Sequence, residues 1–529
     1  MEYSEAEDAE SFKGLGVKTA RRGSIFVFGK LAGALVSLVL LVYLARVLKP
    51  VDYGLYTIVI AYSLVLGMGG NFGMGTAFRK MLPERIRDSE AVKRIIANGM
   101  FVSLSVAFAI AVAGIAAAPY ISFYIYHSPS LSLPLMIAAA SVFLSVLFNA
   151  TVSALIGMHR AMDSTIANLS YSISQLVLVI LLVSLGYGVL GAIAGYAAST
   201  AIGSAAALAY LAKRIGARLG RVERAAIGEI TRFSMPVVAS NVAMTGLMNF
   251  APMLLGVYAT ASIVGNYGIA LKGSRFIDLF VTSITFVLLP AFSTMLASKE
   301  MREKAQHAIN SSIYYTFFLL LPIIAYMIGS AKPLVFLLFS HSYAYAPVYL
   351  SIALAGLAIE VIWGISSTLV IGHGNTRRFM QYQLSIVAIE LAALLMLTPF
   401  YKAYGALAAI FIISPAVATV LYTRLLGKEF GIRIDFSKPA RIAAAATLLA
   451  IILFAVSFYM KESYFALAVN LAVAVLFYPI LASILGAVDN KSIRFMAETS
   501  KGFGAAGKLP LAYLSYFGLF AGRGKSEAQ

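Results

Sequence analysis

The sequence predicts an all-α polytopic membrane protein with 14 transmembrane helices, in which two pseudo-symmetric six-helix lobes surround a central cavity and two extra C-terminal helices follow. Three observations support this prediction. The 529 residues are 60% hydrophobic and only 12% charged, whereas soluble domains carry about 25% charged residues. Apolar runs of about 20 residues, each long enough to span a bilayer as a helix, recur along the chain. Strongly basic and nearly uncharged connections alternate between these runs.

The apolar runs are continuous and rich in Ala, Leu and Val. Membrane β-strands alternate apolar and polar residues, whereas a helix satisfies its own backbone groups in lipid, so each run is predicted to be a helix. Residues 1–23 form a polar cytoplasmic tail without the apolar centre of a cleavable signal peptide, so the first run is expected to stay in the mature protein. The predicted spans are 24–46, 54–78, 95–118, 132–156, 164–185, 189–212, 233–257, 264–297, 307–329, 347–371, 379–399, 404–423, 442–460 and 464–486.

Lys and Arg indicate the orientation, because they collect in cytoplasmic loops. With both termini in the cytoplasm, the inner loops and tails hold 33 of the 41 basic residues and the outer loops hold 5. The others, Lys30, Lys272 and Arg275, fall inside spans. This pattern predicts a multi-pass protein of a prokaryotic plasma membrane with both termini cytoplasmic. The formal charge of +18 is then explained by anionic lipid headgroups, and we expect membrane lipids rather than nucleic acid as partners.

Composition excludes several kinds of site. No cysteine is present, which excludes disulfides and thiolate chemistry. The five histidines have no metal-binding spacing, so we expect neither a metal site nor another cofactor. Residues 487–529 form a basic cytoplasmic tail, in which the apolar run Leu509–Phe520 is too short to span comfortably and is expected to lie on the inner leaflet.

An internal repeat relates the two halves of the chain. Three short motifs recur in the same order: Asp52–Tyr56 and Asn266–Ala270, Leu155–Gly157 and Val370–Gly372, and Gly186–Leu190 and Ala403–Leu407. Their offsets are 214, 215 and 217 residues. Because each copy holds an even number of spans, both enter from the cytoplasm, and the lobes are expected to be related by an axis along the membrane normal. Such a pair of lobes encloses a cleft that opens to either side, as in alternating-access transporters.

The repeat sets the predicted domain boundaries. The N-lobe covers residues 24–212, a cytoplasmic linker covers 213–232 and the C-lobe covers 233–427. The two extra helices occupy 428–486.

Three stretches resemble the polysaccharide-transport flippases of the multidrug/oligosaccharidyl-lipid/polysaccharide (MOP) exporter superfamily. They are Ala45–Tyr56, Asn71–Arg79 and Val264–Lys272, and with the spacing of the spans the resemblance covers about residues 15–486. It implies a flippase that moves a lipid-linked oligosaccharide, on an isoprenoid phosphate or diphosphate carrier, from the inner to the outer leaflet for surface polysaccharide or glycan assembly. It also implies polysaccharide biosynthesis enzymes as partners.

Two other functions stay open. A cation-coupled multidrug exporter has the same fold, although the two extra helices favour the polysaccharide and lipid II branches. A membrane-embedded glycosyltransferase or polysaccharide polymerase would act on the same carriers. Such enzymes expose long catalytic loops that bear acids, whereas the outer loops here are very short and the connection from Ser330 to Ala346 contains no acid. We therefore predict that the chain is not an enzyme.

Charged residues inside spans are the candidate substrate-binding groups. A charge at mid-bilayer costs about 2.5 to 3.5 kcal/mol, so such residues usually face a cavity or a partner. Lys30 lies in the first span, and Lys272, Arg275 and Asp278 share one face of the eighth. We predict that Arg275, Lys272 and Lys30 bind the carrier phosphate; for Arg275, the resemblance to lipid II flippases implies a cavity arginine in this region. The alternatives are an Arg275–Asp278 ion pair and a Lys30 side chain that reaches the interface.

Carboxylates in the second lobe are candidates for cation coupling. Glu360 and Glu390 lie midway along the tenth and eleventh spans, and Asp278 is a third candidate. Buried carboxylates are the usual sites for a coupling proton, and with oxygen ligands such as Gln383, Asn241 or Ser414 they would also suit Na⁺. The alternative is that these acids are neutral and form hydrogen bonds between helices.

Overall fold

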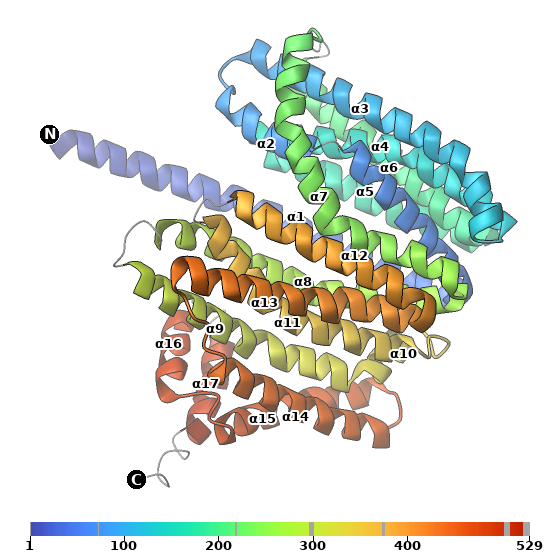
Figure 1. Cartoon of the computed structure of the whole chain (residues 1–529). Coiled ribbons are helices and arrows are strands. Elements are labelled where there is room, and N and C mark those ends of the chain that lie inside the picture. Colours follow the sequence, from blue (N-terminus) through green and yellow to red (C-terminus); the bar gives the residue numbers. More distant parts are fainter. Residues whose placement is uncertain are drawn as a thin grey trace. The chain divides into compact units, whose positions relative to one another are not determined.

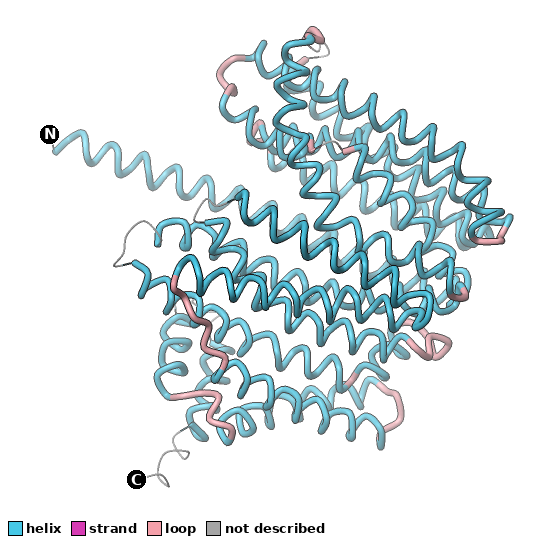
Figure 2. The backbone as a smooth tube through the Cα atoms, viewed as in Figure 1, coloured by secondary structure: helices cyan, strands magenta, loops and turns pink. Residues whose placement is uncertain are grey.

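The computed structural model describes residues 2–71, 73–216, 220–295, 301–372, 376–501 and 508–521. Within these ranges every regular element is a helix (Figure 2). The surroundings of most of these side chains are described, but not those of residues 2–31, 236–245 and 278–287. The prediction of an all-helical chain is confirmed.

Nine helical stretches of the described chain are long and apolar enough to cross a membrane, which confirms a multi-pass membrane protein. Two of them, Ala161–Ile215 with 55 residues and Arg378–Phe430 with 53, exceed the length of one crossing. Because about 20 residues span the hydrocarbon, each has room for two crossings.

The first long helix is broken about two thirds of the way along it. Helix α1 (Glu2–Gly70) contains Lys49, whose backbone has φ 58° and ψ 175°. This conformation is uncommon for a residue with a side chain. Pro50 follows directly, and proline both disfavours a helical conformation at the preceding residue and lacks the N–H that a helix needs. The break therefore falls between the first two predicted spans.

Two further breaks divide the longest stretches. Gly186 has φ 91° and Gly188 has φ 51°, between helices α5 (Ala161–Leu182) and α6 (Gly188–Ile215). Lys402 has φ 50° near the end of α12 (Thr376–Leu407). Positive φ favours glycine and interrupts a helix. Both breaks fall in connections between predicted spans.

The chain divides into two compact units, Met1–Gly265 and Asn266–Gln529. Besides α1, α5 and α6, the first unit contains α2 (Met74–Glu84), α3 (Ser89–Tyr120), η1 (Ile121–Ile125), η2 (Pro129–Leu131), α4 (Ser132–Gly157), η3 (Val183–Tyr187), α7 (Arg224–Tyr258) and the start of α8 (Ala261–Met295) (Figure 1). The predicted lobe and linker boundaries differ from this division and stay predictions.

Apolar side chains from α2, α3 and α4 form one core of the first unit. Phe78 and Leu82 of α2 pack with Ile96 of α3 and with Ala150 and Leu155 of α4, and all five are fully buried. Burial of each such side chain stabilises the folded protein by about 1.5 to 3 kcal/mol relative to leaving it exposed to water. This core fixes α2 across the ends of α3 and α4.

The second unit contains the rest of α8, α12 and ten further helices. These are α9 (Met301–Gly329), α10 (Ala331–Leu338), α11 (Ala346–Gly372), η4 (Ala408–Ile413), α13 (Ser414–Leu425), η5 (Leu426–Phe430), α14 (Ser437–Tyr459), α15 (Tyr464–Ile484), α16 (Asn490–Lys501) and α17 (Lys508–Ala521). Helices α9, α14 and α15 run side by side (Figure 1), so the two extra helices predicted at the C-terminus pack on the second unit.

A buried amide joins these helices. Asn470 of α15 is fully buried and donates hydrogen bonds to the hydroxyls of Ser330, at 2.9 Å, and of Ser457 on α14, at 2.6 Å. Ser457 in turn donates to the carbonyl of Gly329 at 2.9 Å. Polar groups that satisfy one another within an apolar region hold helices together, so α14 and α15 are tied to the end of α9.

The C-terminal apolar helix packs on protein. Phe517 of α17 is fully buried, with its ring centroid 5.2 Å from that of Phe318 on α9. Tyr516 donates a hydrogen bond to the carbonyl of Leu476 on α15 at 3.2 Å. Leu519 is 67% exposed on another face. The helix expected over Leu509–Phe520 is therefore present and covers α9 and α15 with one face; its contact with the inner leaflet stays a prediction.

Candidate functional site

Two cations lie next to each other on α8. Lys272 and Arg275 are three residues apart and exposed, and they are close enough to interact electrostatically. Between them, Ser274 is 3% exposed and donates a hydrogen bond to the carbonyl of Leu271 at 3.0 Å. The helix thus buries its serine face and presents both cations on another face. Two neighbouring cations on an apolar helix would attract an anion.

The other predicted charges on these helices are placed only by their backbone. Lys30 lies on α1 and Asp278 lies on α8, one turn after Arg275. Their side chains lie outside the described residues. Neither the predicted contact of Lys30 with substrate nor the alternative Arg275–Asp278 ion pair is tested, and both stay predictions.

The structure brings Glu390 together with one of its predicted neighbours. The hydroxyl of Ser414, on α13, donates a hydrogen bond to Oε2 of Glu390, on α12, at 2.7 Å. Ser414 is 8% exposed and Glu390 is half-buried. Gln383, two turns earlier on α12, instead accepts a 3.5 Å contact from Tyr422, and Asn241 lies outside the described side chains. Of the oxygen ligands that the sequence suggested for Glu390, the structure places Ser414 beside it.

A tyrosine that the sequence analysis did not select adds to this group. Tyr267, near the start of α8, is fully buried and interacts electrostatically with Glu390. Its hydroxyl has no hydrogen-bond partner among the described residues. A buried hydroxyl without a partner costs about 1 to 3 kcal/mol, so this site has an unused donor and acceptor near a carboxylate. The signal in the sequence is the repeated motif at Asn266–Ala270, which contains Tyr267.

The start of α8 is fixed by the neighbouring residue. Asn266 is 1% exposed, and its side-chain oxygen accepts hydrogen bonds from the backbone N–H groups of Tyr345, at 3.0 Å, and Ala346, at 2.9 Å. These N–H groups lie at the first turn of α11, where a helix leaves donors without an intrahelical partner. The side chain therefore caps α11 and sets the position of Tyr267.

Glu360 is the remaining predicted carboxylate. It lies midway along α11 and is half-buried. Among the described residues, no group of three or more His, Asp or Glu residues is placed to hold a metal ion. The arrangement around Glu390, with a hydroxyl and a phenol, instead suits a proton or a weakly bound monovalent cation.

Within the first unit, α1 crosses the start of α8 through glycine. A β-carbon added at Gly54 would lie 1.8 Å from the carbonyl oxygen of Ala261, and one added at Gly265 would lie 2.1 Å from that of Pro50. Real β-carbons essentially never approach another heavy atom within 3.0 Å. The two helices therefore meet backbone to backbone, an approach that only glycine allows.

Comparison with known proteins identifies the family. The sequence model of a family described as "Polysaccharide biosynthesis protein" matches residues 20–296, which are 277 of the 529 residues. The chain belongs to this family. A search of curated protein sequences finds no match to it.

Solved structures show the fold to which this family member belongs. The structure titled "Lipid II flippase MurJ, inward closed conformation" matches with a TM-score of 0.71 and 15% identity, covering 87% of this chain and 98% of the flippase. An inward-facing multidrug resistance MATE transporter of the MOP superfamily matches with a TM-score of 0.61 and 18% identity, covering 74% and 95%. A MOP superfamily transporter from Pyrococcus furiosus matches with a TM-score of 0.53 and 19% identity, covering 77% and 94%. The family member thus has the fold of the MOP superfamily, as the sequence motifs predicted.

Proposed function

We propose that this member of the polysaccharide biosynthesis family is a flippase that moves a lipid-linked oligosaccharide from the inner to the outer leaflet by alternating access. The observation that carries the proposal is the pair Lys272 and Arg275 on the apolar helix α8. An isoprenoid phosphate or diphosphate needs cations when it leaves water. Arginine offers a fork of donors and lysine a mobile point charge, so together they suit a phosphate, and Lys30 is our third candidate.

The repeated positions of helices support the two predicted lobes. Helices begin at Ser89 and Met301, at Ser132 and Ala346, and at Ala161 and Thr376, so the offsets between the halves are 212, 214 and 215 residues. The tyrosines of the repeated motif, Tyr53 and Tyr267, are 1% and 0% exposed. The same side chain is thus buried in each half, as expected if one six-helix unit was duplicated.

The helix breaks support fourteen spans. Breaks at Lys49, Gly186 and Lys402 divide three of the nine apolar stretches and raise their number to twelve. Helices α7 and α8, of 35 residues each, are not among the nine stretches and add two more.

Ion pairs support the proposed topology of a plasma-membrane protein with both termini in the cytoplasm. Six ion pairs of the described residues each join groups that the topology assigns to one side of the membrane. Lys332 and Glu462 pair across two outer loops at 3.0 Å. The pairs on the cytoplasmic side are Lys93–Glu90, Arg94–Glu223, Arg214–Asp163, Arg378–Glu429 and Lys438–Asp489. A miscounted span would put the partners of some pairs on opposite sides.

Glu390 is our main candidate for cation coupling, with Glu360 and Asp278 as further candidates. The contact with Ser414 and the nearby unpaired phenol of Tyr267 support this assignment. A proton or Na⁺ bound by Glu390 would remove a half-buried negative charge that interacts with Tyr267 of α8. Binding would then favour one conformation of α8 over another, which is what coupling requires.

The crossing of α1 and α8 supports a closed outer side. In the proposed topology Pro50 lies in an outer connection, and Gly54 and Gly265 follow outer connections. The backbones at this crossing leave no room for even one added carbon. A substrate with sugars cannot pass such a contact. The crossing must therefore separate if substrate is to leave on the outer side.

A multidrug-type exporter is the second candidate function, because a MATE transporter shares the fold. The charges discriminate between the two. An exported organic cation would be repelled by Lys272 and Arg275, whereas an anionic carrier would be attracted. An enzymatic role in glycan transfer or polymerisation has no support from the residues described here.

The decisive experiment measures lipid transport directly. The purified chain is reconstituted into vesicles with a labelled isoprenoid-diphosphate glycan, and the label exposed on each leaflet is followed over time. We expect Arg275→Ala to slow transfer by roughly 10- to 150-fold, the value of one or two lost charge-assisted hydrogen bonds. Arg275→Lys should retain part of the rate. Arg424→Ala, which removes an exposed cation at the end of α13, is the matched control.

Two outcomes would reject the proposal. If the unaltered chain transfers no glycan lipid but moves organic cations, the exporter replaces the flippase. If transfer occurs and Arg275→Ala matches Arg424→Ala, the cation pair on α8 does not bind the carrier.

A further inference from the structure

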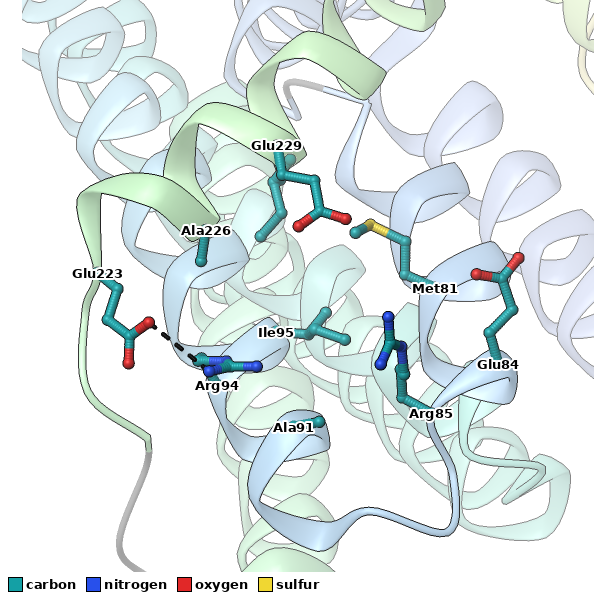
Figure 3. Close-up of a pocket in the computed structure, with 10 residues that line it drawn as sticks. Met81, Glu84, Arg85, Ala91, Arg94, Ile95, Glu223, Ala226 and Glu229 are labelled. Atoms are coloured by element: carbon teal, nitrogen blue, oxygen red, sulfur yellow. Dashed lines mark ion pairs between the residues drawn. The ribbon is translucent and has the colours of Figure 1, made fainter.

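A second site candidate lies in the first unit, among α2, α3 and the start of α7. The end of α2, the start of α3 and the first turns of α7 enclose a cavity of about 260 Å³ (Figure 3). This volume is below the 300 to 1,000 Å³ of pockets for drug-sized ligands. It equals the volume of roughly nine liquid waters, so the cavity suits a small polar group.

The cavity is a built feature, because the chain before α7 is fixed to α3. Asn98 of α3 is fully buried; its amide donates to the carbonyl of Arg221 at 3.0 Å, and its oxygen accepts the backbone N–H of Glu223 at 2.8 Å. A β-carbon added at Gly220 would lie 2.7 Å from the α-carbon of Arg94. These contacts hold the first turn of α7 at a set distance from α3 and keep the cavity open.

Charged groups of both signs face the cavity. Arg94 pairs with Glu223 at 3.7 Å. The guanidinium of Arg85 and the carboxylate of Glu229 point toward the same space, with Glu84 at its rim (Figure 3). In the described chain these three groups form no ion pair within 4.0 Å. The lining thus contains two guanidinium groups and three carboxylates: Glu223 is paired with Arg94, whereas Glu84, Glu229 and Arg85 form no ion pair in the described chain.

This combination excludes a bare phosphate or diphosphate as the best ligand. Like charges 4 Å apart repel by about 1 kcal/mol even in bulk water and by about 4 kcal/mol near a protein surface, so Glu84 and Glu229 would oppose a polyanion. A lone cation would neutralise Glu84 and Glu229 but would leave the guanidinium of Arg85 without an anion. A zwitterion with a phosphate and an ammonium satisfies both sets of charges.

The apolar part of the lining indicates where the zwitterion comes from. Met81 and Ile95 are half-buried and Ile230 is 1% exposed, so methylene groups next to the charges would find apolar contacts. The chain is a multi-pass membrane protein, and the cavity lies at the ends of helices on the side that we propose to be cytoplasmic. A phospholipid headgroup is the zwitterion available there.

We propose that this cavity binds the phosphoethanolamine headgroup of a phospholipid. Arg85 and Arg94 bind the phosphate, and Glu229, assisted by Glu84, accepts hydrogen bonds from the ammonium. The bound lipid bridges α2 and α3 to the first turn of α7 and holds the inner end of α7 in place. The site is separate from the cations of α8 and does not depend on what the chain transports.

The test compares lipids that differ in one feature. The full purified chain is mixed with phosphatidylethanolamine, phosphatidylcholine or phosphatidylglycerol of the same acyl chains, and retained lipid is counted by native mass spectrometry. We expect phosphatidylethanolamine to bind most tightly, because the choline headgroup has no N–H donors and the glycerol headgroup has no cation. Arg85→Ala and Glu229→Gln should each weaken it about tenfold or more. Arg87→Ala, an exposed arginine two residues away that does not line the cavity, should not.

Each other outcome has a definite meaning. Equal binding of the three lipids, or equal effects of Arg85→Ala and Arg87→Ala, would overturn the site. Preference for phosphatidylglycerol would overturn the proposal that the ligand is a zwitterion. If soluble phosphoethanolamine competes fully at the concentration of the lipid, the headgroup chemistry is right but the lipid source is wrong. Thermal unfolding of each variant without lipid shows whether the variant folds. If Arg85→Ala does not fold, the isosteric variant Glu229→Gln provides the test instead.

Discussion

Substitution of Gly54 by alanine tests the crossing of α1 and α8 by adding one carbon. That carbon would lie 1.8 Å from the carbonyl oxygen of Ala261, where about 3.0 Å is the closest approach that real β-carbons show. The helices must therefore separate by about 1.2 Å, the difference between these two values. Overpacking of this kind costs about 1 to 3 kcal/mol. If the crossing closes the outer side, Gly54→Ala should lower the population of the closed form by about 5- to 150-fold relative to the open form.

The assay reads this population without any substrate. The chain has no cysteine, so a single reporter cysteine at Leu271, one turn before Arg275 on α8, is labelled by a membrane-impermeant maleimide added from outside. We expect little labelling in the parent chain and much faster labelling with Gly54→Ala. Because the readout needs no lipid-linked glycan, its result is independent of whether the proposed substrate is right.

A second glycine of α1 provides the control. A β-carbon at Gly67 would meet nothing within 4 Å. Substitution of glycine by alanine stabilises a helix by about 1 kcal/mol at either position. Gly67→Ala therefore stabilises α1 as Gly54→Ala does, but without a clash against α8. Equal labelling and equal transport for the two variants would refute the assignment of the crossing as the outer seal. Thermal unfolding measurements distinguish a folded variant whose outer side is open from a variant that is unfolded.

Three further predictions concern carboxylates and amides. Glu390→Gln should abolish the response of transport to a proton or Na⁺ gradient, and Ser414→Ala should weaken it; an unchanged response in vesicles would exclude Glu390 from coupling. Burial alone would raise the pKa of Asp489, but the hydrogen bond from Lys438 holds it below its ordinary value. We therefore expect Asp489→Asn to destabilise the chain by about 1 kcal/mol at pH 7, and thermal unfolding should show the deficit shrinking as the pH falls below about 4, the ordinary pKa of aspartate. Asn98→Ala should cost about 1 to 3 kcal/mol and speed hydrogen exchange in the first turn of α7; normal exchange there would show that Asn98 does not fix it.

The bilayer explains why so much of the fold was predictable. It requires each spanning segment to be apolar, helical and about 20 residues long, and it sorts Lys and Arg by side. These rules act on single residues and need no knowledge of contacts. The prediction of an all-helical, multi-pass chain with the fold of the MOP superfamily was confirmed for that reason. Even the breaks at Gly186 and Lys402 fall where charge, glycine and proline divided the predicted spans.

The candidate site was only partly predictable. The sequence selected Glu390 and suggested Ser414 because carboxylates and hydroxyls are rare and recognisable within apolar spans. It suggested Gln383 equally, although the structure places that amide against Tyr422. Whether Gln383 of α12 or Ser414 of α13 lies beside Glu390 depends on how the helices rotate about their axes, and continuous apolar runs carry little information on rotation. The same limit hid Tyr267, whose aromatic ring resembles ordinary packing until its unpaired hydroxyl is seen.

Charged loop residues served only as signals of topology in the sequence, so the cavity beside α7 was not predicted. Arg85 and Arg94 contribute to the positive cytoplasmic loops whether or not they face a ligand. Their convergence with Glu229 depends on the buried Asn98 and on Gly220, which lie far apart in the sequence and have no charge to attract notice. A single-residue rule cannot find a site that is made by the return of a linker to a distant helix.

The contrast between two kinds of helix contact bears on how the chain would move. In the second unit, Phe318, Tyr478 and Phe517 interlock as rings with centroids 5.2 to 6.1 Å apart, and separating them would require several side chains to change rotamer and expose apolar surface. The crossing at Gly54 and Gly265 contains no side chain between its backbones, so it separates without any rotamer change. Motion should therefore occur at the glycine contact while the aromatic core with α9, α15 and α17 moves as one body. Alternating access needs both properties in one chain, a contact that opens at low cost and a core that does not deform.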